Sequence, residues 1–220
     1  MVRASARPGA TRLGHRRCQR SAESSRSTSK STVPVWLTEH EHAAVAAAAD
    51  RLLPPHGSHP GGGALGVADY IDALLGAFTC EPPRIWAGGP FSGRAGGTAS
   101  FEQFFVLSRL EELAWRTRIE GSLGIAERER NGPVIGWQQQ YREGIAALGA
   151  DFCDVSGDEQ DARLDRVADF KALLYAHACE GAYGAPEYGG NPAGRGWAAI
   201  RYDGDVQPRG YTDAEVAGRD

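Results

Sequence analysis

Apolar residues recur along much of this chain at the three- and four-residue spacing that buries one face of a helix. The clearest stretch is residues 67–79, in which one face carries Val67, Tyr70, Ile71, Leu74, Leu75 and Phe78. Related patterns predict further helices at 38–53, 100–118, 133–148, 158–165 and 167–180. No alternation of strands with helices is visible. The pattern therefore predicts an all-α fold, a single mostly helical domain with long loops rich in glycine and proline.

Local signals mark where several of these helices begin and end. The segments Thr38–Glu41 and Ser100–Gln103 both have the form of a capping box, which satisfies free backbone N–H groups at a helix start. The pair Pro54-Pro55 ends the first helix, because proline lacks an N–H and restricts the residue before it. Pro133 is suited to the first turn of the helix at 133–148.

Two of the expected helices have a defined buried face. In the helix at 100–118 that face consists of Phe104, Leu107, Leu110 and Ala114. In the helix at 133–148 it consists of Trp137, Tyr141, Ile145 and Leu148. Residues 54–66 and 81–99 contain too much glycine and proline for either regular element and are expected to be loops.

Composition sharpens this picture. Alanine accounts for 34 of the 220 residues, which suits closely packed helices better than strands. Residues 33–220 hold 16 basic and 27 acidic side chains, so the body of the protein is acidic. Nucleic acid binding there is disfavoured, because it requires a basic face that displaces counterions. No run of 18 apolar residues occurs, so no transmembrane helix is predicted.

The first residues differ in charge from the rest. Residues 1–34 are expected to form a disordered, basic, Arg/Ser-rich tail, and residues 35–220 the folded domain. Arg16 and Arg17 form a twin arginine, as in an export signal, but no apolar stretch comes after them. Two interpretations remain open: a disordered tail or wrongly assigned start, and a degenerate targeting segment.

Cysteine spacing excludes several classes of site. No C-x-x-C pair occurs among the four cysteines, which are Cys18, Cys80, Cys153 and Cys179. This spacing argues against a zinc ribbon, a thioredoxin motif and haem attachment. A disulfide among the last three remains open.

The glycine run at 61–66 formally matches the G-x-G-x-x-G dinucleotide motif. That motif needs a preceding strand, whereas a helix ending in two prolines precedes this one, so we interpret the match as chance. No G-x-S-x-G, Walker or H-E-x-x-H motif occurs.

Histidines offer two further candidates. His56 and His59, with His40 and His42 nearby, could supply metal ligands, but we interpret them as solvated loop histidines because little holds them in place. His177 and Glu180 share a helix face and could transfer a proton. The interpretation we favour for this last pair is a structural hydrogen bond or ion pair.

The densest signal lies in residues 180–211, where glycines that allow close backbone approach alternate with tyrosines and a tryptophan. Large rigid rings with polar tips are typical of contact surfaces. The alternative is a C-terminal wrap that covers the core without a partner.

These residues carry a resemblance to a known family. The segment from Glu180 to Asn191, together with Gly196 and Trp197, resembles the signature of the gluconate 2-dehydrogenase subunit 3 family. The likeness extends over about residues 35–215, through Leu37-Thr38, Leu52-Leu53-Pro54, Tyr70-Ile71-Asp72, Pro90-Phe91 and Tyr141–Leu148.

The resemblance implies a non-catalytic small (gamma) subunit of a flavin-dependent sugar or sugar-acid dehydrogenase. In such complexes a large subunit of the glucose–methanol–choline type holds FAD, and a cytochrome c takes the electrons. The small subunit assists maturation of the large one, and in several relatives it carries a twin-arginine export signal. The chain itself is expected to have no catalytic, cofactor or metal site. The family location is the periplasm or the outer membrane face, or the cytoplasm if no export signal exists.

The resemblance and the aromatic composition together predict which residues contact the partner. These are Glu180, Gly181, Tyr183, Pro186, Tyr188, Gly189, Gly190, Asn191, Gly196, Trp197, Gly204 and Tyr211. The sequence departs from the family at Pro192 and at Asp203, where we expect local loop changes only.

Two other function classes are weighed against this one. The first is an independent metal-dependent or small-molecule-binding protein that uses His56, His59, His177 and Glu180. The second is a binding module whose arginines clamp a sugar acid.

Overall fold

A computed structural model describes residues 34–81, 83, 85 and 107–203 of the chain. Within these ranges the regular elements are helices, and no strand occurs, which confirms the predicted all-α class. The α-helices are α1 (Glu39–Leu52), α2 (Val67–Leu75), α3 (Arg109–Glu120), α4 (Trp137–Leu148), α5 (Gly157–Arg166), α6 (Ala168–Tyr183) and α7 (Arg195–Ala199). Short 3₁₀ turns are η1 (Ala77–Thr79), η3 (Ala126–Arg128), η4 (Pro186–Tyr188) and η5 (Pro192–Gly194).

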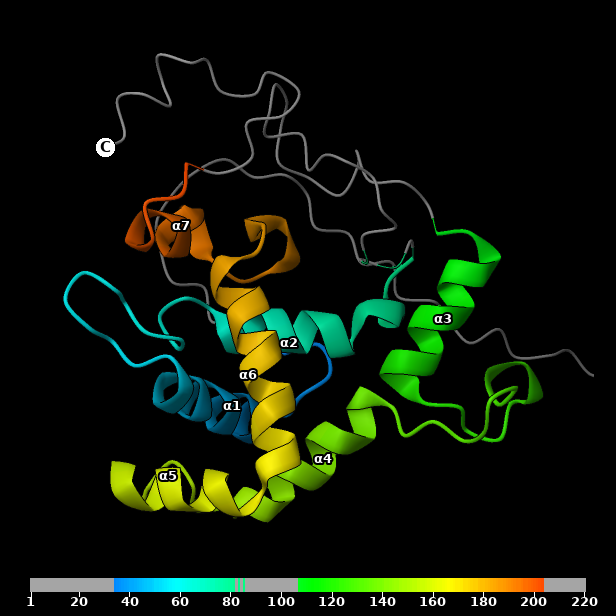
Figure 1. Ribbon diagram of the computed structural model, residues 1–220, viewed down its shortest axis with the longest axis horizontal. Coiled ribbons are helices and arrows are strands. Elements are labelled where there is room, and N and C mark those ends of the chain that lie inside the picture. The colour runs from blue at the N-terminus through cyan, green and yellow to red at the C-terminus, as the bar shows by residue number, and fades with distance from the viewer. Residues whose placement is uncertain (1–33, 82, 84, 86–106, 204–220) are drawn as a thin grey trace, which may run out of the picture.

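Helix α6 lies at the centre of the molecule and packs against α1, α2, α4, α5 and α7 (Figure 1). Several of these contacts depend on residues without large side chains. A Cβ added to Gly144 of α4 would lie 2.2 Å from the Phe170 ring of α6. The core face of α1 is likewise built mainly of small residues, Ala44, Val45, Ala48 and Ala49. An alanine-rich chain can therefore bury a core through close helix approach.

The predicted start and end of the first helix are confirmed. The Thr38 hydroxyl accepts a hydrogen bond from the Glu41 N–H at 3.2 Å, and the Glu41 carboxylate accepts one from the Thr38 N–H at 2.8 Å. Helix α1 ends at Leu52, just before the two prolines. Both ends are explained by local chemistry.

The prediction of a continuous helix over 100–118 was wrong. Residues 100–106, including Phe104, lie outside the described residues, but α3 begins at Arg109 and is capped by Ser108, whose hydroxyl accepts from the Glu111 N–H at 3.3 Å. Leu110 is 75% exposed and Ala114 is also exposed, so the predicted buried face was wrong at these two positions, whereas Leu107 is partly buried and packs against the core. The helix instead buries the side that carries Trp115 and Ile119, which packs against α4 and η1.

Three other boundaries differ from the prediction. Helix α4 begins at Trp137 instead of Pro133, because hydrogen bonds between Ser122 and Val134 hold the preceding residues extended. The helix predicted at 67–79 ends at Leu75 and continues as the separate turn η1. Helix α6 runs past Gly181 to Tyr183, because Gly181 packs within the helix against the Tyr70 ring.

Two further predictions, on membrane-spanning helices and on disulfides, can be compared with the described residues. None of the helices in the described part of the chain is long and apolar enough to cross a bilayer. Cys80, Cys153 and Cys179 form no disulfide with one another. Nearly all of the predicted tail lies outside the described residues.

The start of the described chain is held by one buried carboxylate. Asp72 of α2 is 5% exposed and accepts hydrogen bonds from three consecutive backbone N–H groups. The distances are 2.6 Å from Val35, 2.9 Å from Trp36 and 2.8 Å from Leu37. Hydrogen bonds to a charged group are stronger than neutral ones, so Asp72 fixes residues 35–37 against α2.

Replacing Asp72 with alanine should lower the free energy of unfolding by about 2 kcal/mol, because it leaves one buried and two partly buried N–H donors without an acceptor. Urea unfolding followed by tryptophan fluorescence measures this change. Asp69→Ala on the same helix is the control, since Asp69 is exposed and bonds only the side chain of His42, so its loss should cost less than about 1 kcal/mol. Equal effects of the two substitutions would contradict this role for Asp72.

Candidate functional site

The predicted partner-binding residues that the structure describes gather at one end of the molecule, where α7 folds back against the end of α6 (Figure 1). We call residues 180–203 the C-terminal segment. Gly181 and Tyr183 lie in the last turn of α6, Pro186 and Tyr188 in η4, and Trp197 in α7. The sequence shows no long apolar period after Gly181, and the structure places three short elements between Pro186 and Ala199.

Asn191 is the centre of this segment. Its side chain is 0% exposed, its Nδ2 donates to the Gly184 carbonyl at 2.9 Å, and its Oδ1 accepts from the Gly196 N–H at 2.7 Å. Its own N–H donates to the Leu65 carbonyl at 2.8 Å. The backbone φ of Asn191 is 46°, in the left-handed region that asparagine tolerates better than most residues. Asn191 therefore ties the segment both to itself and to the loop after α1.

Two glycines let the segment approach the backbone of α6. A Cβ at Gly190 would lie 2.2 Å from the Gly181 carbonyl oxygen, and a Cβ at Gly196 would lie 1.9 Å from that of Ala182. Any larger residue would push the segment away from the helix. The Trp197 indole N–H donates to the Tyr183 carbonyl at 2.6 Å, which closes the same contact.

Exposure divides the predicted partner-binding residues into two groups. Buried within the chain are Gly181, Gly190, Asn191 and Gly196. Fully or partly exposed are Glu180, Tyr183, Pro186, Tyr188, Gly189 and Trp197, whereas Gly204 and Tyr211 lie outside the described residues. The buried group sets the shape of the segment, and the exposed group is the part able to contact another protein. Ile200 and Tyr202 add apolar surface, being 51% and 47% exposed.

The loop that contains the glycine run packs against α1. The Gly63 N–H donates to the Asp50 carboxylate at 2.8 Å, and a Cβ at Gly62 would lie 2.6 Å from the Ala49 carbonyl. The glycines are thus explained by close packing onto the helix that precedes them. A helix before the run is also what the sequence predicted.

His177 and Glu180 each bond a tyrosine from another helix. The Tyr141 hydroxyl and His177 Nδ1 are 2.9 Å apart, and the Tyr70 hydroxyl donates to Glu180 at 2.8 Å. Burial lowers the pKa of His177, although the Glu180 carboxylate partly opposes this, and burial raises the pKa of Tyr141 and of Tyr70. These two pairs join α6 to α4 and α2, so each side chain bonds its own tyrosine instead of the predicted bond between His177 and Glu180.

The remaining histidines are spread over the fold. His56 is exposed, whereas His59 is partly buried and its Nε2 lies 2.8 Å from the Tyr183 hydroxyl. His42 lies on α1, where its bond to Asp69 raises its pKa. Our interpretation as solvated loop residues was therefore wrong for His59, which is partly buried, and for His40 and His42, which both lie on α1. Across the described ranges, no three His, Cys, Asp or Glu side chains come together as metal ligands.

A sequence model described as Gluconate 2-dehydrogenase subunit 3 matches residues 39–204. The chain belongs to this family. No curated protein and no solved structure matches the chain significantly. The matched range contains the whole described C-terminal segment, so the geometry around Asn191 describes the part of this family member that carried the resemblance.

Sequence reasoning missed two residues that position this family member's elements. Asp72 was quoted within the resemblance, but its grip on residues 35–37 was not foreseen. Asp50, which holds the glycine run, was not singled out at all. The signal available in the sequence was that Asp50 and Asp72 are acidic residues placed among apolar residues within predicted helices.

Replacing Asn191 with alanine should destabilise the protein by about 2 kcal/mol, because it removes two buried hydrogen bonds and alanine disfavours positive φ. Urea unfolding measures the loss. The control is Ala193→Gly in the same turn, at φ 55°, which should leave stability unchanged or raise it by up to about 1 kcal/mol. If the Asn191→Ala protein is as stable as the wild type, the two side-chain hydrogen bonds of Asn191 do not contribute to stability.

Stability should fall as the pH drops from about 7 to about 5, because His177 is neutral when folded and its pKa is lowered from about 6.5. The unfolded chain then takes up a proton that the folded chain resists. Thermal unfolding of His177→Gln should show a weaker pH dependence over this range. His42→Gln is the opposite control: its raised pKa stabilises the fold at low pH, so its removal should steepen the decline. Parallel curves for His177→Gln and wild type would contradict this assignment.

Proposed function

We propose that this chain is a non-catalytic small subunit that binds the large subunit of a flavin-dependent dehydrogenase and supports its maturation, stability or export. The observation that carries the proposal is the family match over residues 39–204, since the family is that of a dehydrogenase subunit. Family membership implies that the chain is part of a multi-subunit dehydrogenase complex.

Two features of the described residues support an accessory role. The candidate catalytic side chains, His177 and Glu180, are engaged in bonds between helices. The C-terminal segment is a fixed frame around Asn191 that presents exposed residues at its surface. A fixed frame with exposed rings lowers the entropic cost of association, as expected of a binding surface.

The proposal assigns the chemistry to the partner. A large subunit of the glucose–methanol–choline type holds FAD and oxidises a sugar or alcohol, and a cytochrome c subunit accepts the electrons. The complex acts in the periplasm or at the outer face of the cytoplasmic membrane if it is exported, and in the cytoplasm if it is not. The small subunit contributes no cofactor of its own.

Co-expression tests this proposal directly. A flavin-dependent oxidoreductase of the glucose–methanol–choline type from the same organism is produced with and without this chain, and bound FAD, soluble yield and dye-linked sugar oxidation are measured. We expect all three to be severalfold higher with the chain present, because the free large subunit leaves its interface exposed. Purified small subunit alone, as the control, should oxidise no sugar. Equal flavin loading and turnover without the chain would refute the proposal.

A further inference from the structure

The segment between α3 and α4 is an organised loop with an unusual surface. We call residues 121–136 the α3–α4 loop; it projects from the molecule beyond α3, at the right of Figure 1. Its two ends are joined, since the Ser122 N–H donates to the Val134 carbonyl at 3.0 Å and the Val134 N–H donates to the Ser122 hydroxyl at 2.9 Å. Compact loops with joined ends are often functional.

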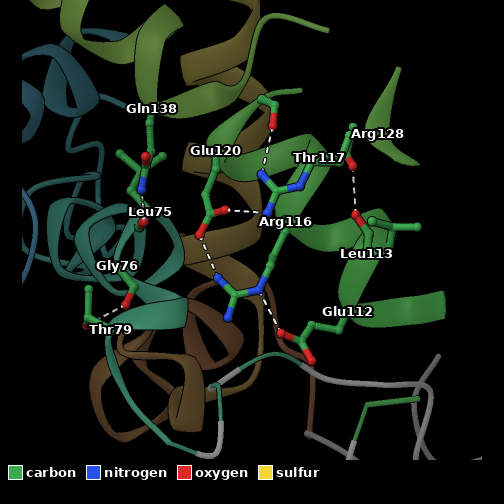
Figure 2. A network of polar contacts seen from close by, with 11 residues as sticks. Leu75, Gly76, Thr79, Glu112, Leu113, Arg116, Thr117, Glu120, Arg128 and Gln138 are labelled. Carbon is green, nitrogen blue, oxygen red and sulfur yellow. Dashed lines mark hydrogen bonds and ion pairs between the residues drawn. The ribbon is translucent and has the colours of Figure 1, made fainter. Parts of the chain in front are cut away.

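Polar side chains hold this loop from the inside. The buried Ser122 hydroxyl donates to Glu129 at 2.9 Å, and the same carboxylate oxygen accepts the Gly124 N–H at 3.1 Å. The Arg128 side chain is only 8% exposed and pairs with Glu120 of α3 at 2.9 Å. Figure 2 shows how Glu120 continues this network along α3 to Arg116, which also bonds Glu112. The loop is therefore anchored to α3.

Aliphatic side chains occupy the outside. Leu123 is 71% exposed, Ile125 42%, Val134 40% and Ile135 58%. Leu123 also has a φ of 49°, a left-handed backbone that costs energy for any residue with a Cβ. Loops normally place polar side chains in water, so this arrangement is the reverse of the usual one. Strain that displays an apolar side chain indicates a site of contact.

The charges of the loop favour an apolar partner surface. Glu127 and Arg128 pair with Arg109 and Glu120 of α3, at 2.7 Å and 2.9 Å, and Glu129 accepts a hydrogen bond from Ser122 within the loop. Arg130, the last charged residue, is exposed at its edge. The loop thus offers four aliphatic side chains with its charges mostly neutralised, which suits a hydrophobic contact.

We infer that the α3–α4 loop inserts into an apolar surface of the large dehydrogenase subunit; this inference rests on the proposed function. Four aliphatic side chains are a small part of the roughly 800 Å² that each partner buries in a stable interface, so the loop alone is too small to hold a dimer of this chain. The loop and α7 lie at opposite sides of the molecule (Figure 1). A partner that contacts both must be extensive, as a large subunit is.

Loop variants test the inference with the co-expressed large subunit. The double variant Leu123→Ser/Ile135→Ser should bind it at least about tenfold more weakly in a pull-down titration, because it removes two apolar anchors. Leu123→Gly should also weaken binding while leaving the unfolding midpoint of the free chain unchanged or higher, because glycine relieves the strain at positive φ. Tyr175→Ser, at a 51% exposed position on α6, is the matched control and should bind as the wild type does.

The outcomes separate the two proposals. If wild-type chain does not bind the large subunit, the proposed function fails and this inference fails with it. If the wild type binds and both loop variants bind equally well, only the loop inference is overturned. A photoreactive Leu123→p-benzoylphenylalanine variant should cross-link to the large subunit. Cross-links only to a second copy of the chain, or only within one chain, would overturn the inference.

Discussion

The end of α6 is approached so closely by the next part of the chain that backbone atoms, instead of large side chains, make the contact. Gly190 meets the Gly181 carbonyl and Gly196 meets the Ala182 carbonyl, at distances where a Cβ could not fit. The amide of Asn191 then bonds both sides of the intervening turn. Because these contacts are short and directional, the position of α7 is determined by the last turn of α6. The same principle of small residues at helix contacts, seen at Gly144 against Phe170, lets an alanine-rich chain form a core.

Local signals were sufficient for some elements and insufficient for others. The Thr38 capping box and the apolar face of α2 depend on neighbours within four residues, so the sequence predicts them correctly. The start of α3 was missed because the sequence offers two boxes of similar form, at Ser100 and at Ser108, and the local pattern does not choose between them. The start of α4 depends on pairing between Ser122 and Val134, twelve residues apart, which no helix-end rule contains.

The candidate site shows the same division. Its glycine and aromatic content indicated close approach and contact, and the resemblance selected the residues by identity. Neither the composition nor the resemblance predicts that Asn191 is fully buried while Glu180 and Gly189 are exposed. Burial depends on groups distant in sequence, such as the Leu65 carbonyl. A family signature combines residues that shape a segment with residues that contact a partner. Only the folded arrangement separates the two.

This separation bears on how a small subunit recognises a larger one. Buried hydrogen bonds of Asn191 hold the C-terminal segment, and polar side chains hold the α3–α4 loop from the inside. Rigid surfaces lose little conformational freedom on binding, so more of the interaction energy is available for association. In the free chain Leu123 is unfavourable for two reasons: its apolar side chain is exposed to water, and its backbone has a left-handed conformation. In the proposed complex, burial of Leu123 against the large subunit removes the cost of hydration, whereas the conformational cost remains.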